Sequence, residues 1–147
     1  MTAPLPTARA HLHHGDADDH VALTYDDRFL RRKVLTSAAG LRFLVDLPHT
    51  TSLGDGDLLQ LDDGRLVAVR AAPEALLSVT GDLVRLAWHI GNRHSPCQID
   101  DDRLLIPVDK VLADMLSQLG ARVDEISAPF TPEGGAYGHG RTLSHAH

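Results

Sequence analysis

The chain has few cysteines, few aromatic residues and a deficit of positive charge. Its single cysteine, Cys97, excludes an internal disulfide and a multi-cysteine zinc site, and favours a reducing compartment. Three Phe, two Tyr and one Trp among 147 residues leave a core made mainly of Leu, Val, Ala and Ile. The formal net charge of -6 argues against a nucleic-acid partner, which requires clustered positive charge.

Long apolar runs and catalytic motifs are also missing from the sequence. No stretch of about 18 apolar residues is present, and no signal-peptide pattern opens the chain, so we expect a cytoplasmic protein without a membrane partner. Neither a phosphate-binding loop nor a dinucleotide-binding glycine pattern occurs. Cys97 has no evident base, and no nucleophile-base pair can be assembled from the spacing. We therefore expect no enzymatic activity.

Histidine, in contrast, is abundant and clustered. Nine of the ten histidines form three groups, which are His11, His13, His14 and His20, then His89 and His94, then His139, His145 and His147. Imidazole is the commonest side-chain ligand for nickel, copper and zinc. Histidines at both ends of the chain and within its folded part indicate a protein that takes up a metal and passes it on.

The first half of the chain has the pattern of short strands. Residues 1–19 contain almost no large apolar groups and are predicted to form a disordered His/Asp tail. Alternating Leu41, Phe43, Val45 and Leu47 indicate a half-buried strand, and LLQLDDGRLVAVRA indicates a hairpin that turns at Asp62-Asp63-Gly64. We predict a small β-barrel or sandwich N-terminal domain over residues 20–72.

The second half has the pattern of an α+β domain over residues 73–130. The expected order is strand 74–80, helix 82–93, strand 97–100, strand 103–107, helix 109–119 and strand 122–127. This order predicts a ferredoxin-like βαββαβ domain. Gly120 stands where a C-cap glycine ends the second helix, whose predicted apolar stripe is Val108, Val111, Leu112, Met115, Leu116 and Leu119. Residues 131–147 are predicted to form a flexible Gly/His tail.

The two central histidines differ in their helical neighbours. His89 shares a face with Arg85 and Arg93, whose charges oppose a nearby cation, so we interpret it as a solvated surface residue. His94 extends the apolar line of Leu83, Leu86, Ala87 and Ile90 to the helix end. It is either a hydrogen-bonded structural residue or a metal ligand. One imidazole cannot hold a metal alone, but a symmetric dimer would bring two copies together on its two-fold axis.

The terminal histidines have spacings that permit metal binding. His145 and His147 are two residues apart, and His139 lies between glycines that leave its backbone free to adapt. The alternative is a polar tail without function. The N-terminal HLHHGDADDH mixes imidazoles and carboxylates, a composition suited to loose metal buffering. It lacks the preceding strand and the later ligands that a metallo-hydrolase would need.

Three segments together resemble one family. LAWHIGNRHSPCQI, DKVLADMLSQLGARV and FTPEGGAYGHGR, with upstream LTYDDRFLRRKVL and DGDLLQLDDGRLVAVRAAPE, look like the UreE family of urease accessory nickel chaperones. The resemblance covers about residues 20–141. It implies a cytoplasmic homodimer that carries Ni²⁺ as cargo to apo-urease, within an accessory complex that includes a GTPase.

The resemblance also implies roles for particular histidines. The GNRH histidine is His94, which would be the metal ligand shared at the dimer interface. His145 and His147 correspond in kind to the family's C-terminal histidines, and His139 belongs to the GAYGHG motif. Some members have a His-x-His pair just before the second helix, where this chain has Val108, Asp109 and Lys110, so a second internal site of that type is not expected. Zn²⁺ or Cu²⁺ would compete at such ligands.

Two other functions use the same residues. A general Ni/Zn/Cu metal buffer or sensor would have these ligands without a urease partner. A plain interaction domain with incidental histidines would bind no metal tightly. Loss of metal binding on substitution of His94 would favour delivery, whereas essential tails with a dispensable His94 would favour buffering.

Overall fold

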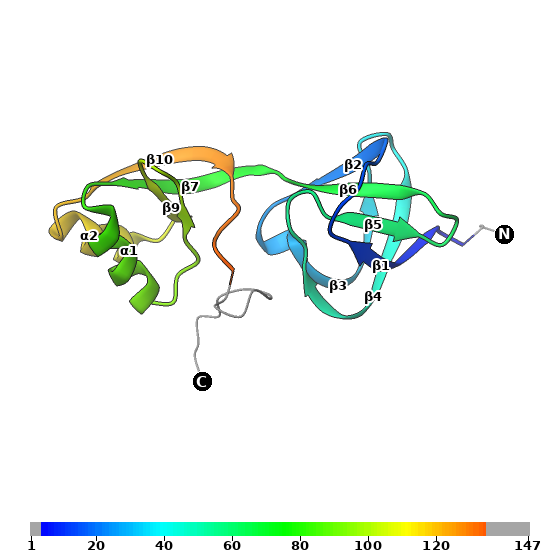
Figure 1. Ribbon diagram of the computed structural model, residues 1–147, viewed down its shortest axis with the longest axis horizontal. Coiled ribbons are helices and arrows are strands. Elements are labelled where there is room, and N and C mark those ends of the chain that lie inside the picture. The colour runs from blue at the N-terminus through cyan, green and yellow to red at the C-terminus, as the bar shows by residue number, and fades with distance from the viewer. Residues whose placement is uncertain (1–3, 135–147) are drawn as a thin grey trace. The chain divides into compact units, whose positions relative to one another are not determined.

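The computed structural model describes residues 4–134 of the chain (Figure 1). Within this range it contains ten strands, two α-helices and one short 3-10 helix, so the predicted mixed α+β class is confirmed. The chain divides into two compact units, residues 1–72 and residues 73–147. In the part of the chain that the structure describes, no helix is long and apolar enough to cross a membrane.

The first unit is one curled six-stranded sheet. Its elements are β1 (Thr7–Leu12), β2 (Asp19–Leu23), the 3-10 helix Asp26–Arg28, β3 (Phe29–Thr36), β4 (Arg42–Ser52), β5 (Leu58–Leu61) and β6 (Leu66–Ala71). The strand order across the sheet is β2-β6-β5-β1-β4-β3. The pairs β1/β4 and β2/β6 are parallel, and the other neighbours are antiparallel.

Two sequence predictions for this unit are confirmed. Phe43, Val45 and Leu47 alternate along β4 and are all buried, as a strand with one face toward the core requires. β5 and β6 form the predicted hairpin, in which Gly64 has φ +91°. A side chain at that backbone conformation would be strained, so glycine is the residue that the turn requires.

The prediction of a disordered tail over residues 1–19 is wrong for residues 7–12, which form β1. β1 lies in the interior of the sheet, where it pairs with β4 on one side and β5 on the other. Ala8 is completely buried and Thr7 nearly so. No alternation of large apolar residues marks this strand in the sequence. Its stability comes from backbone hydrogen bonds to two neighbouring strands and not from large apolar groups.

The second unit is a four-stranded sheet with two helices. Its elements are β7 (Pro73–Thr80), α1 (Leu83–Asn92), β8 (Gln98–Ile99), β9 (Leu104–Pro107), α2 (Lys110–Gln118) and β10 (Arg122–Pro129). The strand order is β10-β7-β9-β8 with every neighbouring pair antiparallel. Both helices pack on the same side of the sheet (Figure 1). The core between them is Leu77, Val79, Leu86, Ile90, Leu104, Ile106, Leu112 and Leu116.

Helix α2 has the predicted ends but a narrower apolar face than predicted. The Asp109 carboxylate accepts a hydrogen bond from the Leu112 amide at 3.0 Å, and Gly120 follows the helix with φ +89°. Leu112 and Leu116 are buried, and Met115 packs partly against the core. Three members of the predicted stripe are instead exposed, namely Val108, Val111 and Leu119. A helix that rests on a sheet buries only its innermost line of residues.

Candidate metal centre

Helix α1 brings the central histidines to the surface of the second unit. Asp82 caps its N-terminus, where the carboxylate accepts from the Arg85 amide at 3.3 Å. Leu86 and Ile90, four residues apart, are buried against the sheet. The helix ends at Asn92, so the segment that follows is held by a firmly packed element.

His94 lies in the turn directly after α1. Its φ is +59°, and it is the one non-glycine residue with positive φ among residues 4–134. The His94 amide donates to the Gly91 carbonyl at 2.9 Å, and the residue is exposed. The prediction that His94 extends the apolar line of α1 is wrong, because the helix stops two residues earlier and the left-handed turn redirects the chain. Histidine is among the residues that adopt this conformation more often than most.

His89 lies against the single tryptophan. Its ring centroid is 5.0 Å from that of Trp88, with the two rings nearly perpendicular. The residue is half-buried, so it is less solvated than the sequence indicated. It borders a shallow hollow of about 480 Å³ together with Asp82, Val84, Arg85 and Trp88. The arginine beside it disfavours a cation there.

Gln98 attaches the start of the C-terminal segment to this region. Its side-chain oxygen accepts from the Thr131 amide at 2.8 Å and from the Thr131 hydroxyl at 3.3 Å. Its side-chain nitrogen donates to Asp100 at 3.0 Å. The Glu133 amide donates to the Cys97 carbonyl at 2.9 Å, and Phe130 is completely buried. Residues 130–133 are therefore fixed beside β8. This strand begins at Gln98, four residues after His94 in the sequence.

Sequence analysis did not identify this attachment. Gln98 belongs to the P-x-Q pattern that follows the GNRH segment, and this pattern was the one sequence signal that could have drawn attention to it. Nothing in the sequence indicated that its partner would be Thr131, because 33 residues separate the two. Only the return of β10 beside β7 brings them together.

Cys97 is unsuited to bind metal or to act as a nucleophile. Burial, together with the nearby Glu133 and Asp100 carboxylates, raises the pKa of its thiol from 9.0 to about 11. The thiolate, which is the reactive and metal-binding form, is thus scarce at neutral pH. This agrees with the sequence-based interpretation of Cys97 as a small apolar residue.

The other predicted ligands fall outside the structural description. His139, His145 and His147 lie beyond residue 134. Within residues 4–134, no group of three or more His, Cys, Asp or Glu side chains could hold a metal as it stands. The structure therefore places His94 on the surface and attaches the start of the C-terminal segment to Cys97 and Gln98, without assembling a complete ligand set among the described residues.

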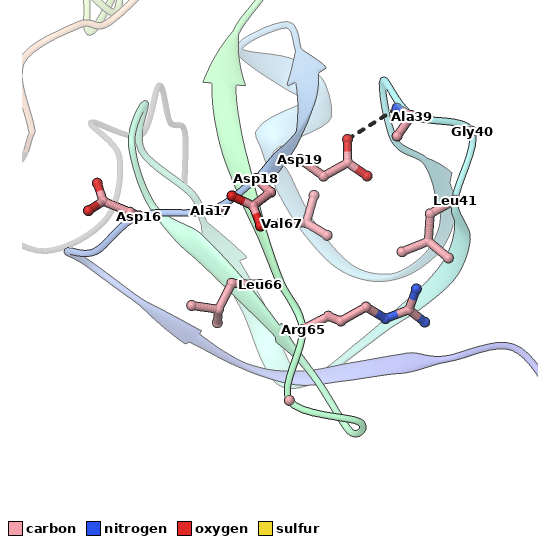
Figure 2. Close-up of a pocket in the computed structure, with 11 residues that line it drawn as sticks. Asp16, Ala17, Asp18, Asp19, Ala39, Gly40, Leu41, Arg65, Leu66 and Val67 are labelled. Carbon is pink, nitrogen blue, oxygen red and sulfur yellow. Dashed lines mark hydrogen bonds between the residues drawn. The ribbon is translucent and has the colours of Figure 1, made fainter.

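A second hollow, of about 650 Å³, lies in the first unit. Asp16, Asp18 and Asp19 border it along the connection that leads into β2 (Figure 2). Asp19 is already used structurally, since it accepts hydrogen bonds from the Ser37 hydroxyl and from the Ala39 amide. The Ser37 hydrogen bond is the main reason that the pKa of Asp19 lies below its usual value. No histidine borders this hollow.

Comparison with known proteins covers both units. Residues 5–72 match the family model described as UreE urease accessory protein, N-terminal domain, and residues 66–147 match the model of the C-terminal domain. A urease accessory protein UreE from Ruegeria pomeroyi is 65% identical over 136 residues, which is 92% of this chain and 91% of the relative. Proteins of the same name from Rhodobacter capsulatus and Cereibacter sphaeroides are 60% and 57% identical, covering 84% and 81% of those relatives.

Proposed function

Because the chain belongs to the UreE family of urease accessory proteins, we propose that it binds Ni²⁺ at His94 and donates it during assembly of the urease metal centre. Members of this family are accessory proteins and not enzymes. The observation that carries the proposal is the position of His94, an exposed imidazole in a left-handed backbone conformation directly after α1. Strained conformations of this kind are concentrated at functional sites.

A homodimer supplies the second ligand. α1 exposes Val84 and Trp88, which are 85% and 64% accessible and lie four residues apart on one helix face. Two large apolar side chains in this arrangement favour burial against another protein surface. If α1 packs against its copy around a two-fold axis, every contact occurs twice and the two His94 side chains are brought toward one another.

The C-terminal segment completes the ligand set with His139, His145 or His147. Residues 130–133 are held beside Cys97 and Gln98, which follow His94 by three and four residues in the sequence. Six residues separate Glu133 from His139, and a chain of that length spans at most about 20 Å. A tether of this kind raises the effective concentration of its ligands at the site.

An all-nitrogen site of this kind suits a metal donor. Imidazole ligands accept Ni²⁺ but also Cu²⁺ and Zn²⁺, so ligand type alone does not select nickel. Geometry, metal supply and the receiving protein provide the selectivity. Transfer takes place in the cytoplasm with the urease accessory machinery, including a nucleotide-hydrolysing partner, since this chain has no phosphate-binding loop of its own.

The proposal extends to the fold of the two units. The second unit is a ferredoxin-like domain, which is supported by its βαββαβ element order and by the sheet order β10-β7-β9-β8. Its four antiparallel strands leave α1 and the following turn at one surface. The first unit is a small barrel-like domain, which is supported by the curled sheet of β1 to β6.

Titration of Ni²⁺ into the full-length protein tests the proposal. Calorimetry on wild type, His94→Ala and His49→Ala is combined with determination of the molecular mass. We expect one tight site per dimer, lost in His94→Ala and retained in His49→Ala, because His49 is exposed on β4 in the other unit. Full binding at that site in His94→Ala would contradict the proposal.

A metal buffer or sensor is the second candidate, and one observation favours it. The rings of His11 and His13 lie 5.3 Å apart, so imidazoles are also gathered away from His94. A buffer would retain most of its nickel capacity in His94→Ala. It would also leave urease activation unchanged when apo-urease and its accessory proteins are supplied with each variant.

A further inference from the structure

We propose that His11, His13 and Asp57 of the first unit form a separate binding site for a first-row divalent metal ion. This site would hold one ion per chain and does not involve His94 or the C-terminal histidines. The proposed site can therefore be tested separately from the proposed nickel delivery.

The strand register brings the three residues together. β1 and β5 are antiparallel, with His11 opposite Leu59 and Leu12 opposite Leu58. The paired register ends there, and His13 follows in a bend, where its Nδ1 lies 3.4 Å from Asp57 Oδ1. His11 and His13 are two residues apart, the spacing that directs side chains to one face of an extended chain. Asp57 is distant in sequence, so the HLHHGDADDH composition alone does not reveal it.

The distances are close to those of neighbouring metal ligands. His13 Nδ1 lies 3.4 Å from Asp57 Oδ1. The His11 and His13 ring centroids are 5.3 Å apart, and the rings are nearly perpendicular. Ligand atoms that each lie about 2.0–2.2 Å from one ion are separated by roughly 3 Å when they occupy adjacent positions. The three side chains do not meet this condition as they stand, so both imidazoles would have to reorient toward Asp57.

Asp57 has the environment of an oriented ligand. Its side chain is only 10% accessible, whereas that of His13 is 73% accessible. The Gly54 amide donates to Asp57 Oδ2 at 2.8 Å and fixes the carboxylate, which leaves Oδ1 directed at His13. Second-layer hydrogen bonds of this type hold metal-binding carboxylates in place. The proposed site thus has one rigid ligand, the Asp57 carboxylate, and two imidazole ligands that can change orientation.

A simple ion pair between His13 and Asp57 explains the arrangement less completely. Such a pair needs one imidazole, and it gives no role to the second ring beside it. The three side chains do not form a closed ligand set as they stand, since no such group of three occurs within residues 4–134. Binding therefore requires His11 and His13 to rotate, which half-buried and exposed side chains on a strand end permit.

The ligand types define the class of metal. Two imidazole nitrogens and one carboxylate oxygen suit Zn²⁺, Ni²⁺, Co²⁺ or Cu²⁺, whereas Ca²⁺ and Mg²⁺ prefer oxygen-only sites. Three protein ligands leave at least one position open for water or for a ligand from another protein. The site is consequently expected to exchange its metal readily.

The experiment isolates this site within the full-length chain. The parent protein carries His94→Ala, His139→Ala, His145→Ala and His147→Ala, so that only the first unit retains histidines of interest. Ni²⁺ is titrated by calorimetry into this parent and into three further variants, His13→Ala, Asp57→Asn and His14→Ala. Asparagine keeps an acceptor for the Gly54 amide, and circular dichroism melting verifies that each variant is folded.

We expect one Ni²⁺ per chain in the parent. His13→Ala and Asp57→Asn should each weaken binding by about ten-fold or more, in line with loss of one ligand or its orientation. His14→Ala is the matched control, since the structure gives it no part in the set, and it should change the affinity less than about two-fold. In ¹H–¹⁵N spectra, Zn²⁺ should shift the amides of His11, His13 and Asp57.

Three results would overturn the assignment. Unaltered Ni²⁺ affinity in His13→Ala would exclude the site. Equal losses in His13→Ala and His14→Ala would mean that the histidines act as a diffuse buffer. Unaltered Ni²⁺ affinity in a folded Asp57→Asn variant would show that the Asp57 carboxylate is not a ligand, and the proposed set of three ligands would be wrong.

Discussion

His94 combines the proposed metal-binding side chain with an unfavourable backbone conformation. A left-handed conformation costs an L-residue roughly 1–2 kcal/mol, and only glycine adopts it freely. His94 has φ +59° at the end of α1. A residue kept there for its imidazole should therefore reduce the stability of the protein relative to glycine. Comparison of two variants that both lack the imidazole separates this cost from metal binding.

His94→Gly should be more stable than His94→Ala by about 1 kcal/mol, because glycine relieves the strain. Both variants should lose the Ni²⁺ site equally. Urea denaturation without metal measures the stability, and calorimetry measures the binding. A His94→Gly variant that is less stable than His94→Ala would show that the turn is not strained.

Gln98 should act as a positioning residue for the C-terminal segment. Gln98→Ala removes the acceptor for the Thr131 amide and hydroxyl, so the segment loses one of the attachments that fix its start. Ni²⁺ affinity at the His94 site should fall several-fold. A double-mutant cycle provides the test, because Gln98→Ala should have no effect when His139, His145 and His147 are already alanine. An equal loss in both backgrounds would mean that Gln98 acts locally.

Cys97 should be almost unreactive. Its pKa of about 11 makes the thiolate at pH 8 roughly a hundred times scarcer than for an unperturbed thiol. Because the folded pKa lies above 9.0, the neutral thiol contributes stability below pH 9 that is lost as the pH rises to about 11. Iodoacetamide alkylation followed against pH should have its midpoint near 11. A midpoint near 8.5 would contradict the burial argument.

Residues with local signals were predictable and residues with distant partners were not. Asp109 and Gly120 delimit α2 through hydrogen bonds and backbone geometry within a few positions. The acceptor role of Gln98 and the proximity of Asp57 to His13 depend on strands that pair only in the folded chain. Sequence spacing contains no information about such contacts.

At the scale of elements, α2 depends on its cap more than on its surface charges. The Asp109 carboxylate satisfies the Leu112 amide, one of the backbone donors that a helix start leaves without a partner. The pair Lys110 and Asp114, 3.7 Å apart, is exposed on the same helix. An exposed ion pair contributes little. The two aspartates therefore provide a matched comparison.

Asp109→Ala should lower the free energy of unfolding by about 1 kcal/mol. Asp114→Ala should change it by less than about 0.5 kcal/mol. Urea denaturation followed by circular dichroism measures both values. Equal effects of the two substitutions would mean that the cap hydrogen bond does not stabilise the helix.

β1 shows why an element can be missed. Its sequence, TARAHL, has no large apolar residue before Leu12, so hydrophobic periodicity gave no indication of a strand. Its backbone pairs with β4 on one side and β5 on the other, so the strand depends on partners that are distant in the sequence. The hairpin of β5 and β6, with its own turn and alternation, was predictable from local sequence.

At the scale of the whole molecule, exposed apolar side chains indicate where a second chain would pack in the proposed homodimer. Among the described residues of the second unit, such side chains are Val84 and Trp88 on α1, Ile99 on β8, and Val108, Val111 and Leu119 at α2. Trp88 is the single tryptophan of the chain, and large aromatic side chains dominate the energetics of protein interfaces. α1 also leads directly to His94, so a two-fold contact there would serve the metal site as well.

Trp88→Asp should convert the dimer into a monomer, because it places a charge in the centre of a buried apolar contact. Light scattering should report twice the chain mass of 15.9 kDa for wild type and a single chain mass for the variant. Val111→Asp is the matched control, since Val111 is 63% accessible but lies on α2, and it should leave the dimer intact. The monomer should also lose the shared Ni²⁺ site although His94 is unchanged. A dimer that survives Trp88→Asp and dissociates in Val111→Asp would place the interface on α2, and α1 would then not bring the two His94 side chains together.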